Sequence, residues 1–224
     1  MIKFDNITVK YNSLPIIEHF SLDVEKGEKV AVCGPSGSGK SSILQIPLGF
    51  VLPESGAVTV DNILLSSQTA WQIRIKTGYV PQEPDLSSGT VRAIINAPFN
   101  YHTNHNLKSN LEKLPGLLEE FALDDSILDK EINTLSGGEK QRIALIIALL
   151  LDRDILLLDE ISSALDPDCR KAVINHLAQI QKTILLVTHD TALLEFCDRK
   201  IEISKTAPQS LLSNQHKENM RKKV

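Results

Sequence analysis

The sequence predicts an α/β protein whose core is a mostly parallel β-sheet covered on both faces. Segments typical of strands alternate with segments typical of helices along the 224 residues, which is the pattern of a parallel sheet with crossover helices. The run at 155–158 has four apolar residues followed by two acids, which indicates a buried strand. A glycine-rich loop at 34–39 stands between a predicted strand and a predicted helix, as phosphate-binding loops do.

The first part of the chain is predicted to contain most of the strands. Residues 2–9 alternate between apolar and polar side chains, and residues 29–33 form a short apolar run that enters the glycine-rich loop. A helix follows from about Lys40, and Pro47 should bend or shorten it because proline cannot donate a backbone hydrogen bond. The predicted strands of this part are 2–9, 16–24, 29–33 and 57–65.

The second part of the chain is predicted to contain longer helices and two more buried strands. Residues 107–121 have a helical pattern that Pro115 and Gly116 should break in two. The remaining elements, two helices and two apolar strands, are predicted at 136–151, 168–181, 155–158 and 183–188. We find no internal repeat in the sequence.

Composition excludes several classes of protein. With 24 basic and 28 acidic residues the formal net charge is −4, which argues against a dedicated nucleic-acid binder because such proteins need a strong basic field. Cys33, Cys169 and Cys197 are too scattered for a disulfide framework and indicate a reducing compartment. The most apolar run, 143–151, has 9 residues, whereas about 20 are needed to cross a bilayer. We expect a cytoplasmic protein that depends on another chain for any membrane part.

The end of the chain, residues 204–224, differs in composition from the rest. It carries five basic residues against the single acid Glu218, which predicts a basic and loosely ordered tail. Such a tail could contact anionic lipid, but a solvated terminus is the favoured interpretation because short charge runs have little specificity.

The phosphate-loop pattern G-x-x-x-x-G-K-[ST] is matched by Gly34-Pro35-Ser36-Gly37-Ser38-Gly39-Lys40-Ser41. Glycines allow the backbone N–H groups to curl around a phosphate, and the following helix adds partial positive charge at its N-terminus. Lys40 can reach the terminal phosphates, and Ser41 offers a hydroxyl to Mg²⁺. The predicted nucleotide-binding residues of this region are Gly34, Pro35, Ser36, Gly37, Ser38, Gly39, Lys40, Ser41 and Ser42.

Two adjacent acids end the apolar run at 155–158. Asp159 would hold magnesium directly or through water, and Glu160 could polarise the attacking water. Alone, this pattern is equally typical of an ordinary strand end. Together with the phosphate loop it favours a catalytic interpretation in which Mg²⁺ takes part.

A third motif, Leu135-Ser136-Gly137-Gly138-Glu139, stands at the start of a predicted helix. Ser136 and Glu139 fit an N-terminal capping box. The two glycines weaken a helix by about 1 kcal/mol each, so a plain cap does not need them, whereas a phosphate that approaches the backbone N–H groups does. The motif resembles the signature sequence of ABC ATPases, the engines of ATP-binding-cassette transporters.

Further matches to this family follow in order along the chain. Tyr11 matches the aromatic residue that stacks on adenine, Gln82 the glutamine loop that contacts magnesium, and His189 the switch histidine that contacts the γ-phosphate. Residues 163–166 match the loop that crosses the dimer interface. The resemblance covers about residues 1–203, almost the whole chain except the tail.

The resemblance implies a P-loop NTPase fold of the RecA-like kind. Its mostly parallel core would carry an N-terminal antiparallel β subdomain and an inserted α-helical subdomain at about 83–135, with 1–203 as the ATPase domain and 204–224 as the tail. The helical subdomain would dock on a membrane subunit. The apolar candidates for that surface are Ile94, Ile95, Pro98, Phe99 and Tyr101, although Phe99 and Tyr101 fit the core of the subdomain equally well.

The resemblance also implies an activity and the residues that carry it. Two copies of the chain would form a head-to-tail dimer, with each ATP between the phosphate loop of one copy and the signature of the other. ATP hydrolysis would reopen the dimer and drive transport through a separate integral membrane permease, which places the chain on the inner face of the cell membrane. The implied catalytic residues are Lys40, Gln82, Glu160 and His189; the signature contacts to ATP are Ser136, Gly137, Gly138 and Glu139; the magnesium ligands are Ser41, Gln82 and Asp159.

A narrower likeness and two alternatives complete the sequence-based interpretation. Residues 117–128 resemble the helical region of short bacterial FetA-type subunits, which are linked to iron export. In this family the membrane partner contacts the cargo, so the sequence of this chain does not specify one. The alternative function is a soluble single-cassette ATPase that acts as an assembly scaffold. A phosphate-loop kinase is disfavoured because residues 135–139 and His189 would have no use.

Overall fold

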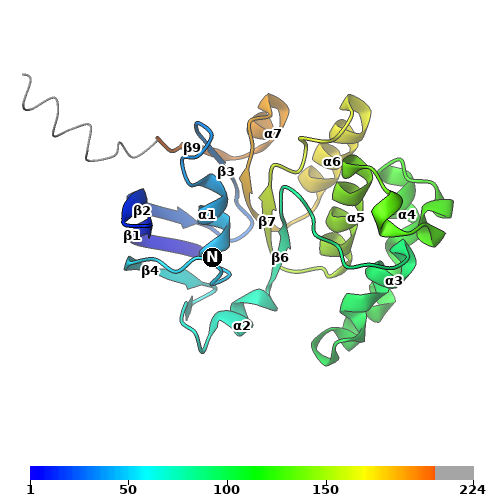
Figure 1. Cartoon of the computed structure of the whole chain (residues 1–224), viewed down its shortest axis with the longest axis horizontal. Helices are drawn as coiled ribbons and strands as arrows, with labels where there is room; N and C mark the ends of the chain where they lie inside the picture. Colours follow the sequence, from blue (N-terminus) through cyan, green and yellow to red (C-terminus); the bar gives the residue numbers. More distant parts are fainter. Residues whose placement is uncertain (205–224) are drawn as a thin grey trace, which may run out of the picture.

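Two β-sheets and a set of helices make up residues 1–204, the part of the chain that the computed structural model describes (Figure 1). The antiparallel sheet lies at one end of the molecule, the parallel sheet in the middle, and most of the helices beyond it. The predicted basic tail lies outside the described residues from position 205 on.

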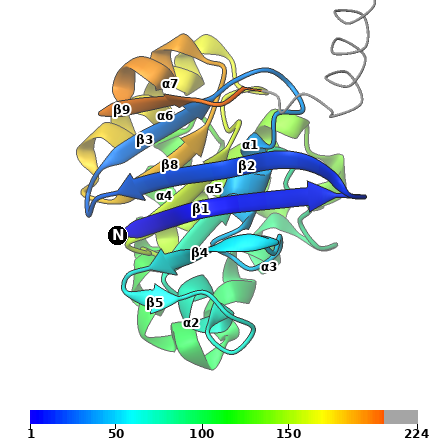
Figure 2. The same ribbon diagram turned by 90° about the vertical axis from the view of Figure 1, so that its left-hand side faces the viewer.

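The antiparallel sheet has the strand order β2-β1-β4-β5, and Figure 2 shows the four strands side by side. Their bounds are Ile2–Tyr11 (β1), Leu14–Val24 (β2), Ser55–Val60 (β4) and Ile63–Leu64 (β5). The strand character predicted for residues 57–65 is confirmed, and the segment contains two strands, β4 and β5, joined by a hairpin turn. Asp61 and Asn62 have φ angles of 49° and 63°, the left-handed conformation that a two-residue hairpin turn needs.

The second sheet is entirely parallel and has the order β6-β7-β8-β3-β9. Its strands are Lys29–Cys33 (β3), Thr77–Val80 (β6), Ile155–Asp159 (β7), Thr183–Val187 (β8) and Arg199–Glu202 (β9). The predicted parallel core is therefore confirmed. Strands β6 and β9 were not predicted, because each has only four residues and no clear alternation of apolar and polar side chains.

The parallel sheet is buried on both faces, as predicted. Ile155 and Leu157 of β7 pack with the antiparallel sheet and α1, whereas Leu156 and Leu158 pack with the helices on the other side. Successive side chains of a strand point to opposite faces, so a continuous apolar run is what this position requires. One cover of the sheet is thus mostly a second sheet rather than a layer of helices.

The helix after the glycine-rich loop, α1 (Lys40–Gln45), has six residues and ends two positions before Pro47. The predicted shortening by this proline is therefore confirmed.

Helical elements fill most of the sequence between β6 and β7. In chain order they are α3 (Val91–Asn96), η1 (Ala97–Asn100), η2 (His102–Lys113), α4 (Leu114–Glu120), η3 (Asp125–Asp129), η4 (Ile132–Thr134) and α5 (Gly137–Leu150), where η marks a 3₁₀ helix. The helices elsewhere are α2 (Ala70–Arg74), α6 (Pro167–Gln179) and α7 (Thr191–Phe196). No helix within residues 1–204 combines the length and hydropathy of a membrane span.

The predicted division of residues 107–121 into two helical elements is confirmed, although it comes just before Pro115 and Gly116 and not at them. Both residues lie in the first turn of α4, where proline is tolerated because the first N–H groups of a helix have no partner within it. The change from 3₁₀ to α geometry comes at Leu114 instead.

The predicted docking surface was wrong for three of its residues. Ile94, Ile95 and Phe99 are buried, with Phe99 only 1% exposed, because they pack against α4, α5 and the 3₁₀ turns that follow α4. Tyr101 is 68% exposed, so its assignment to the core was wrong while that of Phe99 was correct. The helical segment uses these apolar residues to hold itself together.

We expect Phe99→Ala to lower the free energy of unfolding by about 3–5 kcal/mol, because it empties a fully buried aromatic site. Tyr101→Ala, its exposed neighbour, should change stability by no more than about 0.5 kcal/mol. Urea denaturation of the two variants measures both values. Equal losses would contradict the burial of Phe99.

Candidate functional site

The predicted catalytic residues meet at the carboxyl ends of the parallel strands. The phosphate loop follows β3, Gln82 follows β6, Glu160 follows β7 and His189 follows β8. These strands are neighbours in the sheet and run in the same direction, so their carboxyl ends lie side by side. Such an edge is the usual ligand site of parallel α/β sheets.

The phosphate loop approaches another backbone so closely that its first glycine cannot be replaced. Gly34 has a φ of 149°, and a Cβ on it would lie 2.2 Å from the carbonyl oxygen of Ile203. Ile203 N–H in turn donates to Cys33 O at 2.9 Å, which fixes this contact next to β9. The sequence carried no sign that Ile203 supports the loop.

The side chain of Lys40 is folded back over the loop. Its Nζ donates to Gly34 O at 2.9 Å and to Pro35 O at 3.0 Å, and the residue is buried. Two backbone carbonyls of the turn thus hold a single ammonium group. An ammonium in this position can transfer its hydrogen bonds to phosphate oxygens that enter the loop.

A pocket of about 300 Å³ joins the loop to two of the other predicted residues. It is lined by Ile16, Ser36, Gly37, Gly39, Lys40, Ser41, Ser42, Gln82 and Glu160. His189 lines a neighbouring pocket of about 340 Å³ that also includes Glu160. Tyr11, at the end of β1 and well exposed, does not line either pocket, and neither do residues 136–139.

Glu160 stands between the two pockets and is held from both sides. Gln82 Nε2 donates to Glu160 Oε2 at 3.1 Å, and His189 Nε2 lies 3.5 Å from Glu160 Oε1. The backbone of Glu160 has a φ of 44°, a strained conformation for a residue with a side chain. A carboxylate held in this way can accept a proton from a water molecule beside the phosphate loop.

Asp159, one residue earlier, is buried at the end of β7. Desolvation raises the pKa of its carboxyl above the usual 3.8, and the charge of Glu160 adds to this, while a hydrogen bond with Ser41 and the charge of Lys40 act in the opposite direction. Its Oδ1 is buried and has no hydrogen-bond partner among the described residues. Mg²⁺ prefers oxygen ligands in proteins. The Asp159 carboxylate, with one oxygen that accepts no hydrogen bond, and the Ser41 hydroxyl beside it supply such ligands. These residues therefore fit the predicted magnesium ion.

The predicted capping box at the start of α5 is confirmed. Glu139 N–H donates to Ser136 Oγ at 3.3 Å, and Ser136 N–H donates to Glu139 Oε2 at 2.8 Å. The Ser136 hydroxyl also donates to Glu139 Oε2 at 2.8 Å. These hydrogen bonds hold the pKa of Glu139 below its usual value.

The two glycines of the capping box have different surroundings. A Cβ on Gly138 would lie 2.5 Å from Ala164 O, so this position must be glycine for α5 to pack against the 163–166 loop. A Cβ on Gly137 would meet nothing within 4 Å. Packing within the chain explains Gly138 but not Gly137, whose bare backbone faces open space.

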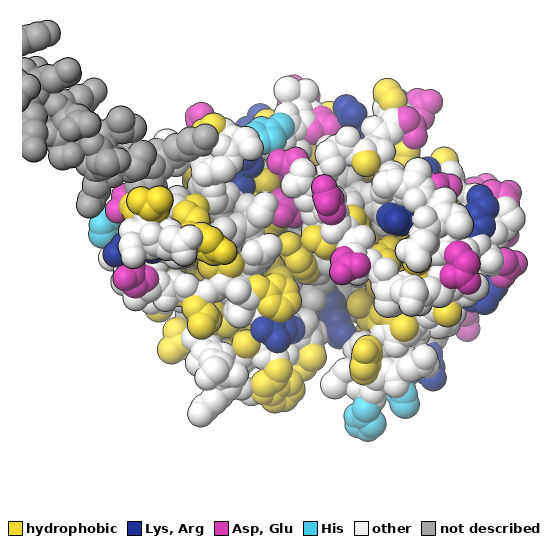
Figure 3. All heavy atoms as spheres, viewed as in Figure 1, with side chains coloured by type: hydrophobic (Ala, Val, Ile, Leu, Met, Phe, Trp, Pro, Cys, Tyr) yellow, Lys and Arg dark blue, Asp and Glu magenta, His cyan; other side chains and the backbone are white. Residues whose placement is uncertain are grey.

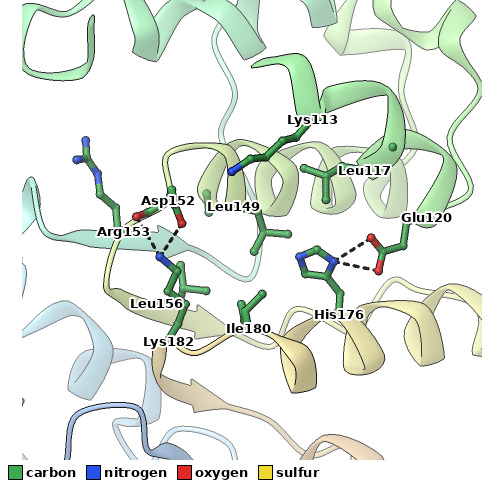
Figure 4. A pocket seen from close by; sticks show the side chains of 12 residues that line it. Lys113, Leu117, Glu120, Leu149, Asp152, Arg153, Leu156, His176, Ile180 and Lys182 are labelled. Atoms are coloured by element: carbon green, nitrogen blue, oxygen red, sulfur yellow. Dashed lines mark hydrogen bonds and ion pairs between the residues drawn. The ribbon is translucent and has the colours of Figure 1, made fainter. Parts of the chain in front are cut away.

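A pocket of about 500 Å³, larger than the two pockets beside Glu160, lies at the opposite end of the parallel strands (Figure 4). Helices α4, α5 and α6 form most of its walls, and a hydrogen bond of 2.8 Å joins His176 of α6 to Glu120 of α4. On another side of the pocket, an ion pair joins Lys182 Nζ to Asp152 Oδ1 at 2.6 Å. The lining residues include none of the predicted site residues. Size alone does not identify the functional site in this protein.

Comparison with known proteins gives consistent results. The sequence matches the ABC transporter family over residues 17–163. It is 33% identical over 199 residues to the energy-coupling factor transporter ATP-binding protein EcfA1 of Mycoplasmopsis synoviae (strain 53), which covers 85% of this chain and 74% of that protein. It is 35% identical over 216 residues to the ATP-dependent permease MDL1 of Candida albicans, which covers 89% of this chain and 31% of that protein.

A solved structure agrees with these sequence matches. The ATP-binding cassette MJ0796, in a dimeric post-hydrolysis state bound to ADP and Pi, is similar to this structure with a TM-score of 0.82 at 29% identity. The similar region covers 92% of this chain and 97% of that chain.

Replacing Gly137 and Gly138 separately distinguishes packing of α5 against the 163–166 loop from access of a phosphate to the backbone of α5. We expect Gly138→Ala to destabilise the protein by about 1–3 kcal/mol, because its methyl group would overlap Ala164 O. Gly137→Ala should leave the fold intact or stabilise α5 by up to about 1 kcal/mol. It should nevertheless slow ATP hydrolysis if a phosphate approaches this backbone. Thermal melts and an ATPase assay test both variants, and a stable, fully active Gly137→Ala would contradict the phosphate contact.

The buried carboxyl of Asp159 should destabilise the nucleotide-free protein. Because its pKa is raised on folding, the folded state binds this proton more tightly than the unfolded state, so stability falls as pH rises above about 4. Asp159→Asn should therefore raise the melting temperature in EDTA at pH 8 and flatten its dependence on pH. Asp154→Asn, an exposed acid before β7, is the control. A lower melting temperature for Asp159→Asn would contradict this account.

Proposed function

Because the chain belongs to the ABC transporter family as an ATP-hydrolysing subunit, we propose that it drives transport as a head-to-tail dimer that closes on ATP and reopens after hydrolysis. The observation that carries the proposal is Glu160, held by Gln82 and His189 at the mouth of the phosphate loop. The relatives named for energy-coupling factor and permease functions support a role in transport.

Binding of the nucleotide depends on the phosphate loop. Lys40 would exchange the carbonyls of Gly34 and Pro35 for phosphate oxygens, and backbone N–H groups of residues 36–42 would donate to the same phosphates. Ser41, Gln82 and Asp159 would hold Mg²⁺, which neutralises part of the phosphate charge when bound. Tyr11 is exposed at the end of β1, where adenine could stack on it.

Hydrolysis requires a water molecule between Glu160 and the γ-phosphate. Glu160 accepts the proton as the water oxygen bonds to phosphorus, and the bond from phosphorus to the ADP oxygen breaks. His189 lies near the same carboxylate and would contact the γ-phosphate from the neighbouring pocket. The positive φ of Glu160 turns its side chain away from the strand direction toward this space.

The dimer explains why one chain contains two separate sites for phosphate. Ser136, Gly137, Gly138 and Glu139 do not line the pocket of the phosphate loop in their own chain. The exposed backbone at Gly137 can reach only a phosphate that comes from outside the chain. The similarity to a cassette solved as a dimer bound to ADP and Pi supports this arrangement.

A permease would dock on exposed apolar residues near α2, and the helical segment at 83–135 would form the other side of that surface. Figure 3 shows hydrophobic side chains gathered on this face beside basic ones. The exposed apolar residues of this patch are Phe50, Leu52, Leu64, Trp71 and Ile75, and Arg74 lies 4.8 Å over the Phe50 ring. Exposed apolar side chains in such numbers are typical of an interaction surface. The chain would then lie on the inner face of the membrane.

The permease would determine which cargo is transported, and two lines of comparison predict different cargoes. The likeness of residues 117–128 to FetA-type subunits predicts export of iron or another metal. The relatives named as energy-coupling factor transporter subunits point to a different kind of transporter. Identification of the membrane partner decides between them.

Glu160→Gln should bind ATP normally, accumulate as a dimer and hydrolyse ATP about 10²–10⁴-fold more slowly, because the amide cannot accept the proton of the water. Glu195→Gln, an exposed acid on α7, is the matched control and should keep wild-type activity. Size-exclusion chromatography with Mg-ATP and a phosphate-release assay measure both effects. Normal turnover of Glu160→Gln would remove Glu160 from the proposed role.

The same variant identifies the partner of the cassette. Tagged Glu160→Gln with Mg-ATP should recover one multi-span membrane protein in equal amount from detergent-solubilised membranes, whereas Lys40→Ala should recover much less because it cannot bind ATP. Recovery of soluble partners alone would favour the assembly-scaffold function instead.

A further inference from the structure

The guanidinium of Arg170 connects two loops that the proposed mechanism treats as separate. We infer that Arg170 is a positioning residue for ATP hydrolysis, which holds His189 in place through Asp190 and ties it to the 163–166 loop. The inference rests on the proposed role of His189. Arg170 had no place in the predicted site, although it lines the pocket that contains Glu160 and His189.

The contact between Arg170 and Asp190 is an ion pair between two elements. Arg170 lies in the first turns of α6, and its Nε is 3.0 Å from Asp190 Oδ2 at the start of α7. The Asp190 side chain is 11% exposed, so water screens the pair only in part. The Nε–H is buried and does not align with a hydrogen-bond acceptor, so the attraction is mainly between charges.

Asp190 is fixed by its other contacts and therefore carries His189 with it. Its Oδ1 accepts from Ala192 N–H at 2.9 Å and caps α7, and its own N–H donates to Thr188 Oγ1 at 3.0 Å. His189 lies between these two residues in the chain. A shift of Asp190 relative to α6 must move the His189 side chain relative to Glu160, 3.5 Å away.

On its other side Arg170 holds the loop that precedes α6. Its Nη2 donates to Leu165 O at 3.4 Å, and Leu165 itself is buried. The preceding residue, Ala164, packs its carbonyl against Gly138 at the start of α5. Contacts therefore run without interruption from the signature helix through the loop and Arg170 to the histidine.

Arg170 is not placed to touch the reacting atoms, because Asp190 stands between it and His189. Loss of either charge should leave the phosphate loop and its pocket intact, since neither Arg170 nor Asp190 lines that pocket. The expected effect is on the rate of hydrolysis and not on the binding of ATP. A purely structural role would instead lower stability and leave kcat unchanged in the folded fraction.

The test is a double-mutant cycle with Arg170→Gln and Asp190→Asn. Asparagine caps a helix as well as aspartate does, so Asp190→Asn removes the charge while it preserves the start of α7. Each single variant should lower kcat about tenfold with little change in KM for ATP, and the double variant should be no slower than either single one, because they break the same interaction. Lys171→Gln, on the same helix, is the control and should behave as wild type.

Two outcomes would overturn the inference: unchanged kcat in both single variants, or losses that multiply in the double variant. Melting temperatures report folding, and if Arg170→Gln does not fold, Asp190→Asn alone still decides, since its cap is retained. His189→Ala tests the premise separately. If His189→Ala hydrolyses ATP normally, the proposed role of His189 fails. If it is inactive while the Arg170 and Asp190 variants keep their kcat, only the positioning role fails.

Discussion

The end of strand β7 imposes the constraint on which the site depends. A strand buried on both faces must be apolar to its last residue, yet this one ends in an acid that is itself buried and then in a second acid with a positive φ. Both features cost free energy: the buried Asp159 carboxylate loses its hydration, and the positive φ of Glu160 strains the backbone. They persist because the neighbouring strands hold β7 in register along its whole length. The stability of the sheet thus keeps two carboxylates beside the phosphate loop.

The same sheet edge brings together residues that are distant in the sequence. Gln82 and His189 are 107 positions apart (189 − 82), yet both approach the carboxylate of Glu160 because β6 and β8 flank β7. The signature at the start of α5 lies on a different surface, and the 163–166 loop stands between it and the histidine. The two segments that we propose to contact phosphate are therefore linked by a short series of contacts.

Sequence patterns predicted the local parts of this arrangement and missed the tertiary ones. The phosphate loop, the capping box and the buried strands depend on neighbours in the chain, so their residue types identify them directly. Strand β6 has four residues and β9 is exposed at the sheet edge, so neither has a period to detect. Ile94 and Phe99 are apolar, as residues of a docking surface would be. Only the fold shows that α4, α5 and the turns after α4 already cover them. Arg170 could not be identified, because its partner Asp190 lies on another helix.

The position of Lys40 fixes the starting point from which the phosphate loop would bind a ligand. A free lysine side chain loses up to about 2 kcal/mol of rotamer entropy when a ligand immobilises it. Here the carbonyls of Gly34 and Pro35 already hold the ammonium. The side chain therefore loses this entropy on folding and not on binding of a nucleotide. Nucleotide entry then becomes an exchange of one set of acceptors for another. The affinity of the loop should reflect the difference between carbonyl and phosphate oxygens as acceptors, and the loop can release its ligand without having to disorder.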